Sequence, residues 1–263
     1  MTPPVEDVEF LSRSAHRVAV LDALADGPRD RAELRDETGA SDPTIGRILG
    51  DFEARGWTRR DGHAYALTRP GAYVAEHFAA LLTRMETERR LRDAWPLLPG
   101  DLDGFDLDLL VDAVVTTVEP DDPYAPENRC ASFYPTTDRV RGFDAALTAP
   151  HTFEGLAELV LGGLEAEFVV TPDLSRNLEA SYPEADRALT ASENLTLWLN
   201  GSLPTCRVVV FDERVGVGGY DPDSGVLGVY VDSDAPELRE WAVSTFERFR
   251  RAARPAREER PTT

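Results

Sequence analysis

The sequence contains no lysine, and all 28 basic residues among its 263 are arginine. Without lysine there can be no phosphate-binding P-loop, no Schiff-base lysine and no His-x-Lys phosphodiesterase pair. The chain also lacks Gly-x-Ser-x-Gly, His-Glu-x-x-His and paired-cysteine motifs, which excludes several classes of hydrolase and zinc protein. We therefore expect no enzyme, no catalytic residue, no metal and no cofactor.

Cysteine and long apolar runs are also scarce. Cys130 and Cys206 are the two cysteines, and they lie far apart in the sequence. Such a pair is more typical of isolated buried thiols in a cytosolic protein than of a disulfide. No run of 18 apolar residues occurs, and the N-terminus lacks the basic and apolar regions of a signal peptide. We expect a cytoplasmic protein with no membrane partner.

Acidic residues are abundant: 48 Asp and Glu give a net charge of −20. Dense carboxylates keep a surface hydrated at molar salt, where the Debye length is only about 3 Å. With the arginine-only basicity, this composition indicates a halophilic source. Residues 1–70 hold 10 Arg against 13 acidic residues, whereas residues 99–263 hold 14 against 31. DNA would therefore meet the least repulsion at the N-terminal third.

Short helices followed by a hairpin are predicted for the N-terminal part. Helical patterns cover residues 5–25 and 29–38, the second ending at Gly39, and Ser41 is a suitable N-cap for a third helix. Apolar residues of that third helix share one face, which must be buried: Ile45, Ile48, Leu49 and Phe52. Residues 57–68 are predicted to form a hairpin with an Asp-Gly turn of type I′.

This order of elements is that of a winged helix-turn-helix, whose third helix enters the major groove of double-stranded DNA. Its exposed side chains would reach bases or phosphates, and the hairpin, as the wing, would lie over the backbone. The predicted DNA-binding residues are Ser41, Thr44, Arg47, Arg59, Arg60 and His63. Among them, Arg47 is the best candidate for base recognition, because arginine can bind guanine through two hydrogen bonds.

A long helix is predicted from Pro70 to Trp95. Its apolar residues repeat at coiled-coil spacing over two heptads: Val74, Phe78, Leu81 and Met85. The spacing favours a helix shared in a homodimer, while packing on its own winged domain alone is the alternative. Beyond Pro96 the chain becomes acidic and linker-like.

The remaining sequence alternates strand-length apolar runs with helical patterns, which predicts an α/β domain with an antiparallel section. Strands are predicted at 109–118, 168–171, 195–199, 207–211, 215–220 and 226–231, and helices near 136–147, 152–165, 173–189 and 235–252. The glycines of 216–219 do not match a dinucleotide loop, since its third glycine would fall on Asp221. We expect a hairpin with close backbone packing there instead.

Together these patterns predict an α+β N-terminal winged helix-turn-helix, a long linker helix and a C-terminal α/β domain with a mixed sheet. The predicted regions are 1–69 for DNA binding, 70–98 for connection or dimerisation, 99–255 for effector binding or regulation, and 256–263 as a disordered tail. For a possible small-molecule effector, aromatic or polar-tipped residues at strand ends are pocket candidates: Arg129, Tyr134, His151 and Trp198. Each of them is more often structural.

Two parts of the sequence resemble known families. Residues 31–49 and 52–57 resemble the recognition helix and the approach to the wing in archaeal winged-helix regulators. The segments DPYAPENR (122–129), DERVGVGGYD (212–221) and REWA (239–242) resemble the C-terminal domain of archaeal two-domain regulators that govern methanogenesis and cell filamentation. The resemblance implies a haloarchaeal transcription regulator. A protein that contacts the basal transcription machinery without binding DNA, and an enzyme on the C-terminal domain, remain the alternatives.

Overall fold

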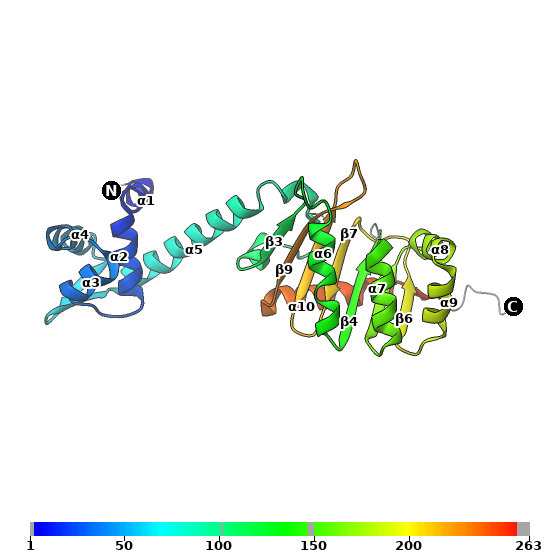
Figure 1. Ribbon diagram of the computed structural model, residues 1–263. Coiled ribbons are helices and arrows are strands. Elements are labelled where there is room, and N and C mark those ends of the chain that lie inside the picture. Colours follow the sequence, from blue (N-terminus) through cyan, green and yellow to red (C-terminus); the bar gives the residue numbers. More distant parts are fainter. Residues whose placement is uncertain (1–2, 101, 147–149, 257–263) are drawn as a thin grey trace. The chain divides into compact units, whose positions relative to one another are not determined.

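The computed structural model describes residues 3–100, 102–146 and 150–256, and the chain divides into two compact units, Met1–Met85 and Glu86–Thr263 (Figure 1). Each unit has its own hydrophobic core. Within the described residues, no helix combines the length and the apolar character needed to cross a membrane. The predicted division by role, at residues 69 and 98, stays a prediction.

The first unit has the predicted order of a winged helix-turn-helix. Its elements are α1 (Pro4–Ser12), α2 (Ala15–Ala25), α3 (Arg31–Thr38), α4 (Asp42–Ala54), β1 (Thr58–Asp61), β2 (Ala64–Leu67) and the first part of α5 (Arg69–Leu91). The predicted apolar face of α4 is fully buried in the core of this unit. The structure thereby confirms the fold predicted for the N-terminal part.

Local signals fix the helix that precedes α4. The Asp30 carboxylate accepts hydrogen bonds from the backbone of Ala32 and Glu33, and the Glu33 side chain accepts one from the Asp30 backbone at 2.7 Å. This capping box satisfies the free amides at the start of α3. Gly39 ends the helix with φ +67°, a left-handed conformation that glycine adopts without strain.

The turn of the hairpin differs in type from the predicted one. The register pairs Asp61 with Ala64, so Gly62 and His63 form the two-residue loop. Only Gly62 has a positive φ, of 64°. A type I′ turn needs positive φ at both central residues, whereas type II′ needs it at the first alone, so the turn has the type II′ pattern.

The second unit is built on one mixed sheet. Its elements are η1 (Trp95–Leu97), η2 (Leu107–Leu110), β3 (Val114–Thr117), α6 (Ala125–Ala131), η3 (Tyr134–Thr136), β4 (Arg139–Asp144), α7 (Pro150–Leu161), β5 (Glu165–Val170), α8 (Pro172–Ser181), α9 (Pro183–Ala191), β6 (Leu195–Leu199), β7 (Cys206–Val210), β8 (Val215–Tyr220), β9 (Leu227–Ser233), α10 (Pro236–Arg251) and β10 (Arg254–Pro255). The strand order is β10-β6-β5-β4-β7-β8-β9-β3. Strands β4, β5 and β6 are parallel, and the other pairings are antiparallel. The predicted mixed α/β sheet is confirmed.

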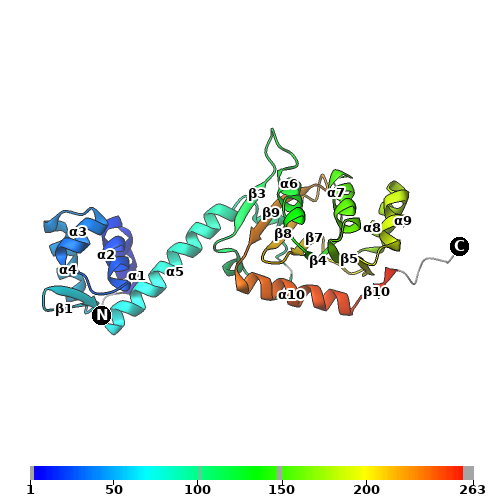
Figure 2. The same ribbon diagram turned by 60° about the horizontal axis from the view of Figure 1, so that its bottom comes forward.

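Helices cover both faces of this sheet. Helices α6, α7, α8 and α9 lie on one face and α10 on the other (Figure 2). Strands β7, β8 and β9 are buried along their whole length. Because successive residues of a strand point to opposite faces, Arg207 and Val209 of β7 face α6–α9 while Val208 faces α10.

One predicted element is wrong and another is too long. The segment 136–147 is predicted to be helical, yet it contains the central strand β4; in the predicted strand 109–118, only Val114–Thr117 forms a strand (β3), and the segment begins in a 3₁₀ turn. Gly142 and Asp144 are poor strand formers, so local propensity misleads there. Their partners come from β7: Gly142 pairs with Val209, and Asp144 pairs with Arg207.

The glycines of β8 confirm the expected close packing. A Cβ on Gly216 would collide with the hydroxyl of Tyr230, and a Cβ on Gly219 would collide with the carbonyl oxygen of Leu97. The space that a side chain would occupy at these two glycines is therefore filled by neighbouring groups of the protein, and not by a nucleotide. At the C-terminal end, Ala256 is buried in the core, and the rest of the predicted tail lies outside the described residues.

Candidate functional sites

Three of the predicted DNA-binding residues lie at the start of helix α4, outside its buried apolar face: Ser41 as the N-cap, then Thr44 and Arg47. Ser41 and Arg47 are exposed and Thr44 is half-buried. The hydroxyls of Ser41 and Thr44 are 2.9 Å apart. Within the described residues, the Arg47 guanidinium has no hydrogen bond or ion pair. Its five N–H donors are free to contact a ligand.

The hairpin places its three predicted residues in solvent. Arg59, Arg60 and His63 are all exposed. Arg60 donates to the carbonyl of Gly62 at 3.1 Å, and Arg59 lies 3.8 Å from the Asp61 carboxylate. These contacts are weak because the side chains are solvated, so both guanidinium groups can turn toward an anionic surface.

The four effector candidates do not come together. Tyr134 lines a cavity between the sheet and helices α7–α9. Arg129 instead binds Asp232 with two hydrogen bonds, at 2.7 and 2.9 Å. Trp198 faces α10, on the other side of the sheet, and donates to Glu167 at 3.0 Å. His151 belongs to α7, but its side chain lies outside the described residues.

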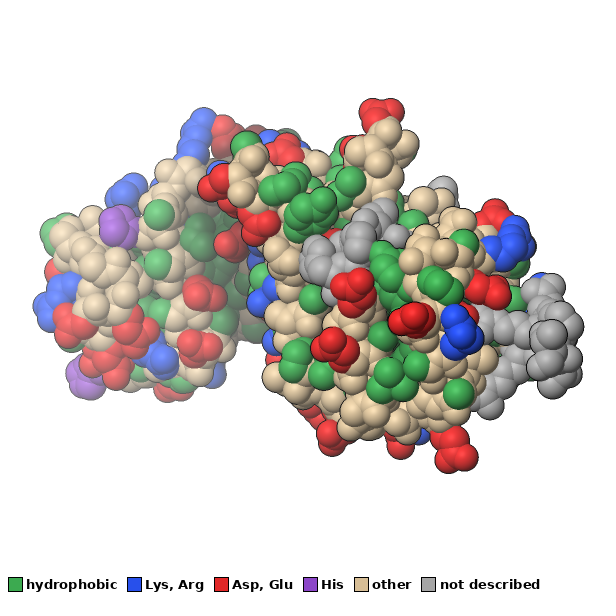
Figure 3. All heavy atoms as spheres, turned by 45° about the vertical axis from the view of Figure 1, so that its right-hand side comes forward, with side chains coloured by type: hydrophobic (Ala, Val, Ile, Leu, Met, Phe, Trp, Pro, Cys, Tyr) green, Lys and Arg blue, Asp and Glu red, His purple; other side chains and the backbone are tan. Residues whose placement is uncertain are grey.

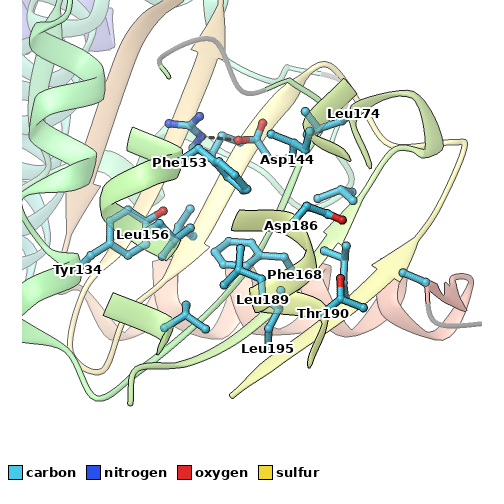
Figure 4. A pocket seen from close by; sticks show the side chains of 17 residues that line it. Tyr134, Asp144, Phe153, Leu156, Phe168, Leu174, Asp186, Leu189, Thr190 and Leu195 are labelled. Carbon is cyan, nitrogen blue, oxygen red and sulfur yellow. Dashed lines mark hydrogen bonds and ion pairs between the residues drawn. The ribbon is translucent and has the colours of Figure 1, made fainter. Parts of the chain in front are cut away.

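The cavity has a volume of about 110 Å³. One water needs roughly 10–15 Å³ of such space, so a small organic molecule fits. Its walls are mainly aliphatic and aromatic side chains from β4–β7 and α7–α9, among them Phe153, Phe168 and Leu189 (Figure 4). Besides the phenol of Tyr134, two carboxyl groups and one guanidinium line it: Asp144, Asp186 and Arg207.

Arg207 is the centre of a buried ion network. Its Nε donates to Asp144 at 2.7 Å, and its Nη1 donates to Glu127 at 2.7 Å. The exposed fractions of the three side chains are 2% for Arg207, 11% for Asp144 and 1% for Glu127. The Tyr220 hydroxyl donates to the other oxygen of Asp144 at 2.6 Å. One cation thus holds two carboxylates out of water.

Burial controls the protonation of this network. It raises the pKa of Asp144, and the positive charge of Arg207 and the hydrogen bond from Tyr220 act in the opposite direction. Burial also raises the pKa of Tyr220 well above its ordinary value. Tyr220 therefore stays a neutral donor to Asp144 at neutral pH.

A second ion cluster fixes helix α6 to the sheet. The buried carboxylate of Asp232 on β9 binds Arg129 of α6 and Arg214, the latter at 2.6 Å. Since Glu127 of the same helix binds Arg207, two ion pairs tie α6 to strands β7 and β9. The sequence segments 122–129 and 212–221 meet in this region.

Sequence reasoning missed Asp144, Arg207 and Glu127. A signal was present, because Arg207 precedes a run of three valines in a strand pattern. A charge in a buried strand requires a partner of opposite sign. The sequence could not identify the partner, since Asp144 is 63 residues away and Glu127 is 80 residues away.

The chain combines a winged helix-turn-helix, a long helix and a mixed α/β domain that contains a cavity. This combination defines the class of two-domain regulatory proteins. Comparison with protein families gives the particular family. Residues 5–90 match the HVO_A0261 N-terminal domain, and residues 123–252 match the middle domain of the methanogenesis regulatory protein FilR1. The chain belongs to the archaeal two-domain winged-helix regulators that carry these domains. No curated protein matches it.

Several solved structures are similar at low identity. TrmBL2, an archaeal chromatin protein that binds DNA, is 16% identical, with 95% of this chain and 99% of that chain covered and a TM-score of 0.42. The phospholipase D family member Nuc from Salmonella typhimurium is 15% identical over 55% of this chain and 98% of its own, with a TM-score of 0.42. The repressor BigR from Xylella fastidiosa is 23% identical over 31% and 89%, with a TM-score of 0.26. All three TM-scores are below 0.5, too low to support a shared function.

Proposed function

We propose that this protein is a sequence-specific DNA-binding transcription regulator of a halophilic archaeon, acting as a homodimer with an effector site in its second unit. The observation that carries the proposal is the exposed face of α4. Among the residues that the structure describes, Arg47 has no hydrogen-bond or ion-pair partner, and it lies on this helix near Ser41 and Thr44. Helix amides near Ser41 and the two hydroxyls suit a phosphate, while Arg47 suits a guanine.

Acidic surface elsewhere supports this placement of the DNA. Asp and Glu side chains are spread across the visible face of the second unit, with only scattered Arg (Figure 3). Residues 99–263 carry 31 of the 48 acidic residues. The first unit is thus the surface that repels a polyanion least.

The test is genome-wide crosslinking, followed by fluorescence anisotropy on the recovered DNA. The Arg47→Ala variant should bind about 5-fold to 150-fold more weakly, the equivalent of about 1–3 kcal/mol, and should lose discrimination at one base pair. Arg176→Ala is the matched control, because Arg176 is an exposed arginine of α8 in the other unit. Equal affinity of both variants would contradict the proposed role of Arg47.

The wing is tested separately. Arg59→Ala and Arg60→Ala should weaken binding to all DNA sequences alike, since phosphate contacts carry no sequence information. If substituting Arg47, Arg59 and Arg60 together left DNA binding intact, recognition by this surface would be wrong. Recovery of DNA by crosslinking, with no binding of the purified protein, would favour an adaptor that contacts the basal transcription machinery.

Salt dependence follows from the acidity. We propose that cations bridge carboxylates of the protein and phosphates of DNA at high salt. An ordinary basic protein loses about 0.9 log units of affinity per neutralised phosphate for each log unit of salt. The affinity of this protein should fall less steeply between low and molar KCl, measured by anisotropy. An ordinary steep slope would contradict the bridging.

The dimer is proposed to use apolar residues of α1 and α5. Half of the predicted seam packs on the core of its own unit, while Leu81 and Met85 are 44% and 54% exposed. Val8 of α1 is 45% exposed and borders the same groove as Leu81. Sedimentation velocity should show a dimer that Leu81→Arg dissociates. Val114→Arg, at an exposed valine of the other unit, is the control and should remain dimeric.

A further inference from the structure

A second arginine, besides Arg47, lies against helix α4. Arg31 is the exposed first residue of α3, and α3 and α4 lie side by side (Figures 1 and 2). A Cβ added at Gly46 of α4 would lie 3.3 Å from Nη2, 3.6 Å from Cζ and 3.7 Å from Nη1 of Arg31. The Arg31 guanidinium therefore lies over Gly46, one residue before Arg47 in α4.

The Arg31 guanidinium has no hydrogen-bond or ion-pair partner in the part of the chain that the structure describes. Asp30 and Glu33, the acidic residues closest to it in α3, accept backbone hydrogen bonds in the capping box. Arg31 and Arg47 thus give one surface two cations without a counter-charge from the described chain. An anion that binds there would form charge-assisted hydrogen bonds to both.

Gly46 is an unfavourable residue for the helix that contains it. It lies inside the 13-residue helix α4, where glycine is less stable than alanine because its backbone loses more freedom on folding. A side chain longer than alanine at this position would fill the space that the Arg31 guanidinium occupies. Glycine at position 46 therefore lowers the stability of the helix and leaves room for a cation on its surface.

We propose that Arg31, held against Gly46, contacts a DNA phosphate next to the base pair that Arg47 reads. In a helix-turn-helix the first helix of the motif crosses the DNA backbone while the second enters the major groove. Arg31 belongs to the first of these helices and Arg47 to the second. Because the guanidinium already rests on α4, it loses less side-chain freedom when DNA binds. This contact rests on the proposed function, in which α4 binds DNA.

Fluorescence anisotropy on the full chain tests the contact, with the recovered DNA and a duplex of the same length and unrelated sequence. Arg31→Ala should weaken both complexes by the same factor, since a phosphate contact carries no sequence information. The ratio of wild-type to variant affinity should fall about eight-fold for each ten-fold rise in KCl, because one neutralised phosphate contributes about 0.9 log units. Arg35→Ala is the control, since Arg35 is an exposed arginine of the same helix that is bound to Asp36. The same loss in both variants would show a general effect of charge and overturn the contact.

Gly46→Leu tests the position of the guanidinium. Leucine is a far better helix former than glycine, so the Tm of the first unit should rise by about 3–6 °C, followed by circular dichroism. DNA binding should nevertheless weaken about as far as in Arg31→Ala, because the leucine displaces the guanidinium. Gly50→Leu is the matched control: no other described group lies within 4 Å of a Cβ at Gly50, so the Tm should rise and the affinity should stay unchanged.

The double variant separates displacement of Arg31 from a direct clash with DNA. In the Arg31→Ala background, Gly46→Leu should weaken binding no further, since the two changes remove the same contact. An equal loss in both backgrounds would show that the leucine meets the DNA itself, and would overturn the role of Gly46.

Failure of this contact can be told apart from failure of the proposed function. If the wild-type protein binds DNA and Arg31→Ala binds it equally well with the same dependence on KCl, the contact is wrong and the regulator stands. If the wild-type protein binds neither duplex, both are wrong.

Discussion

Replacing Arg207 by methionine should destabilise the second unit far more than the same replacement of an exposed arginine. The change leaves Glu127 and Asp144 buried without their cation, at side-chain exposures of 1% and 11%. Removing one partner of a buried ion pair costs about 3–5 kcal/mol. For a unit of this size each kcal/mol lowers Tm by about 2–4 °C, so we expect a fall of about 6–20 °C.

The matched control is Arg139→Met on strand β4. Arg139 pairs with Glu165, but the two side chains are 71% and 61% exposed, and such a pair contributes less than about 1 kcal/mol. Unfolding is followed by circular dichroism and tryptophan fluorescence at constant KCl. If both variants lost the same stability, the buried network would not hold this unit together.

The pH dependence gives an independent check on the Arg207→Met variant. Burial raises the pKa of Asp144, and Arg207 opposes that rise in the native protein. Without Arg207 the folded-state pKa rises further above the unfolded value. Between these two values the folded variant binds more protons than the unfolded chain, so its stability increases as the pH falls through that window. Neutralising both carboxylates as well, with Glu127→Gln and Asp144→Asn, should restore most of the stability at neutral pH.

Three further outcomes are expected. Alkylation of Cys130 and Cys206 by iodoacetamide at neutral pH should report unfolding only, because both thiols are buried and burial raises the pKa of Cys206 to about 12; fast labelling of the native protein would contradict this. Gly219→Ala should lower the Tm of the second unit, since its Cβ meets the carbonyl of Leu97, and an unchanged melting curve would be inconsistent with that contact. Phe52→Ala, at a fully buried position, should cost the first unit about 3–5 kcal/mol in urea unfolding, and a loss below 1 kcal/mol would argue against its place in the core.

Patterns that depend on near neighbours were predicted well. The face of α4 follows from helical spacing alone, and the bounds of β6 and β8 match the apolar runs. Strand β4 was missed because what stabilises it is distant. The presence of Gly142 and Asp144 in a strand is explained only by their partners on β7, which lie more than 60 residues later in the sequence.

The candidate sites show the same contrast between features that depend on near neighbours and features that depend on distant parts of the chain. Exposure of Arg47 and of the wing residues could be inferred from periodicity and from the hairpin, since both are local. The cavity could not, because its walls come from strands and helices brought together by the sheet order. Sequence reasoning selected Tyr134, which lines the cavity, and Trp198, which lies on the opposite face, with no means of telling them apart.

The buried position of Arg207 limits how the basic residues of this chain could be redesigned. Exchanging exposed arginines such as Arg176 for lysine, for example to attach a label, preserves a solvated charge. The same exchange at position 207 would replace a planar fork that reaches two carboxylates from three nitrogens by a single ammonium group. A lysine-bearing version of this protein is therefore feasible on its surface and not in its core.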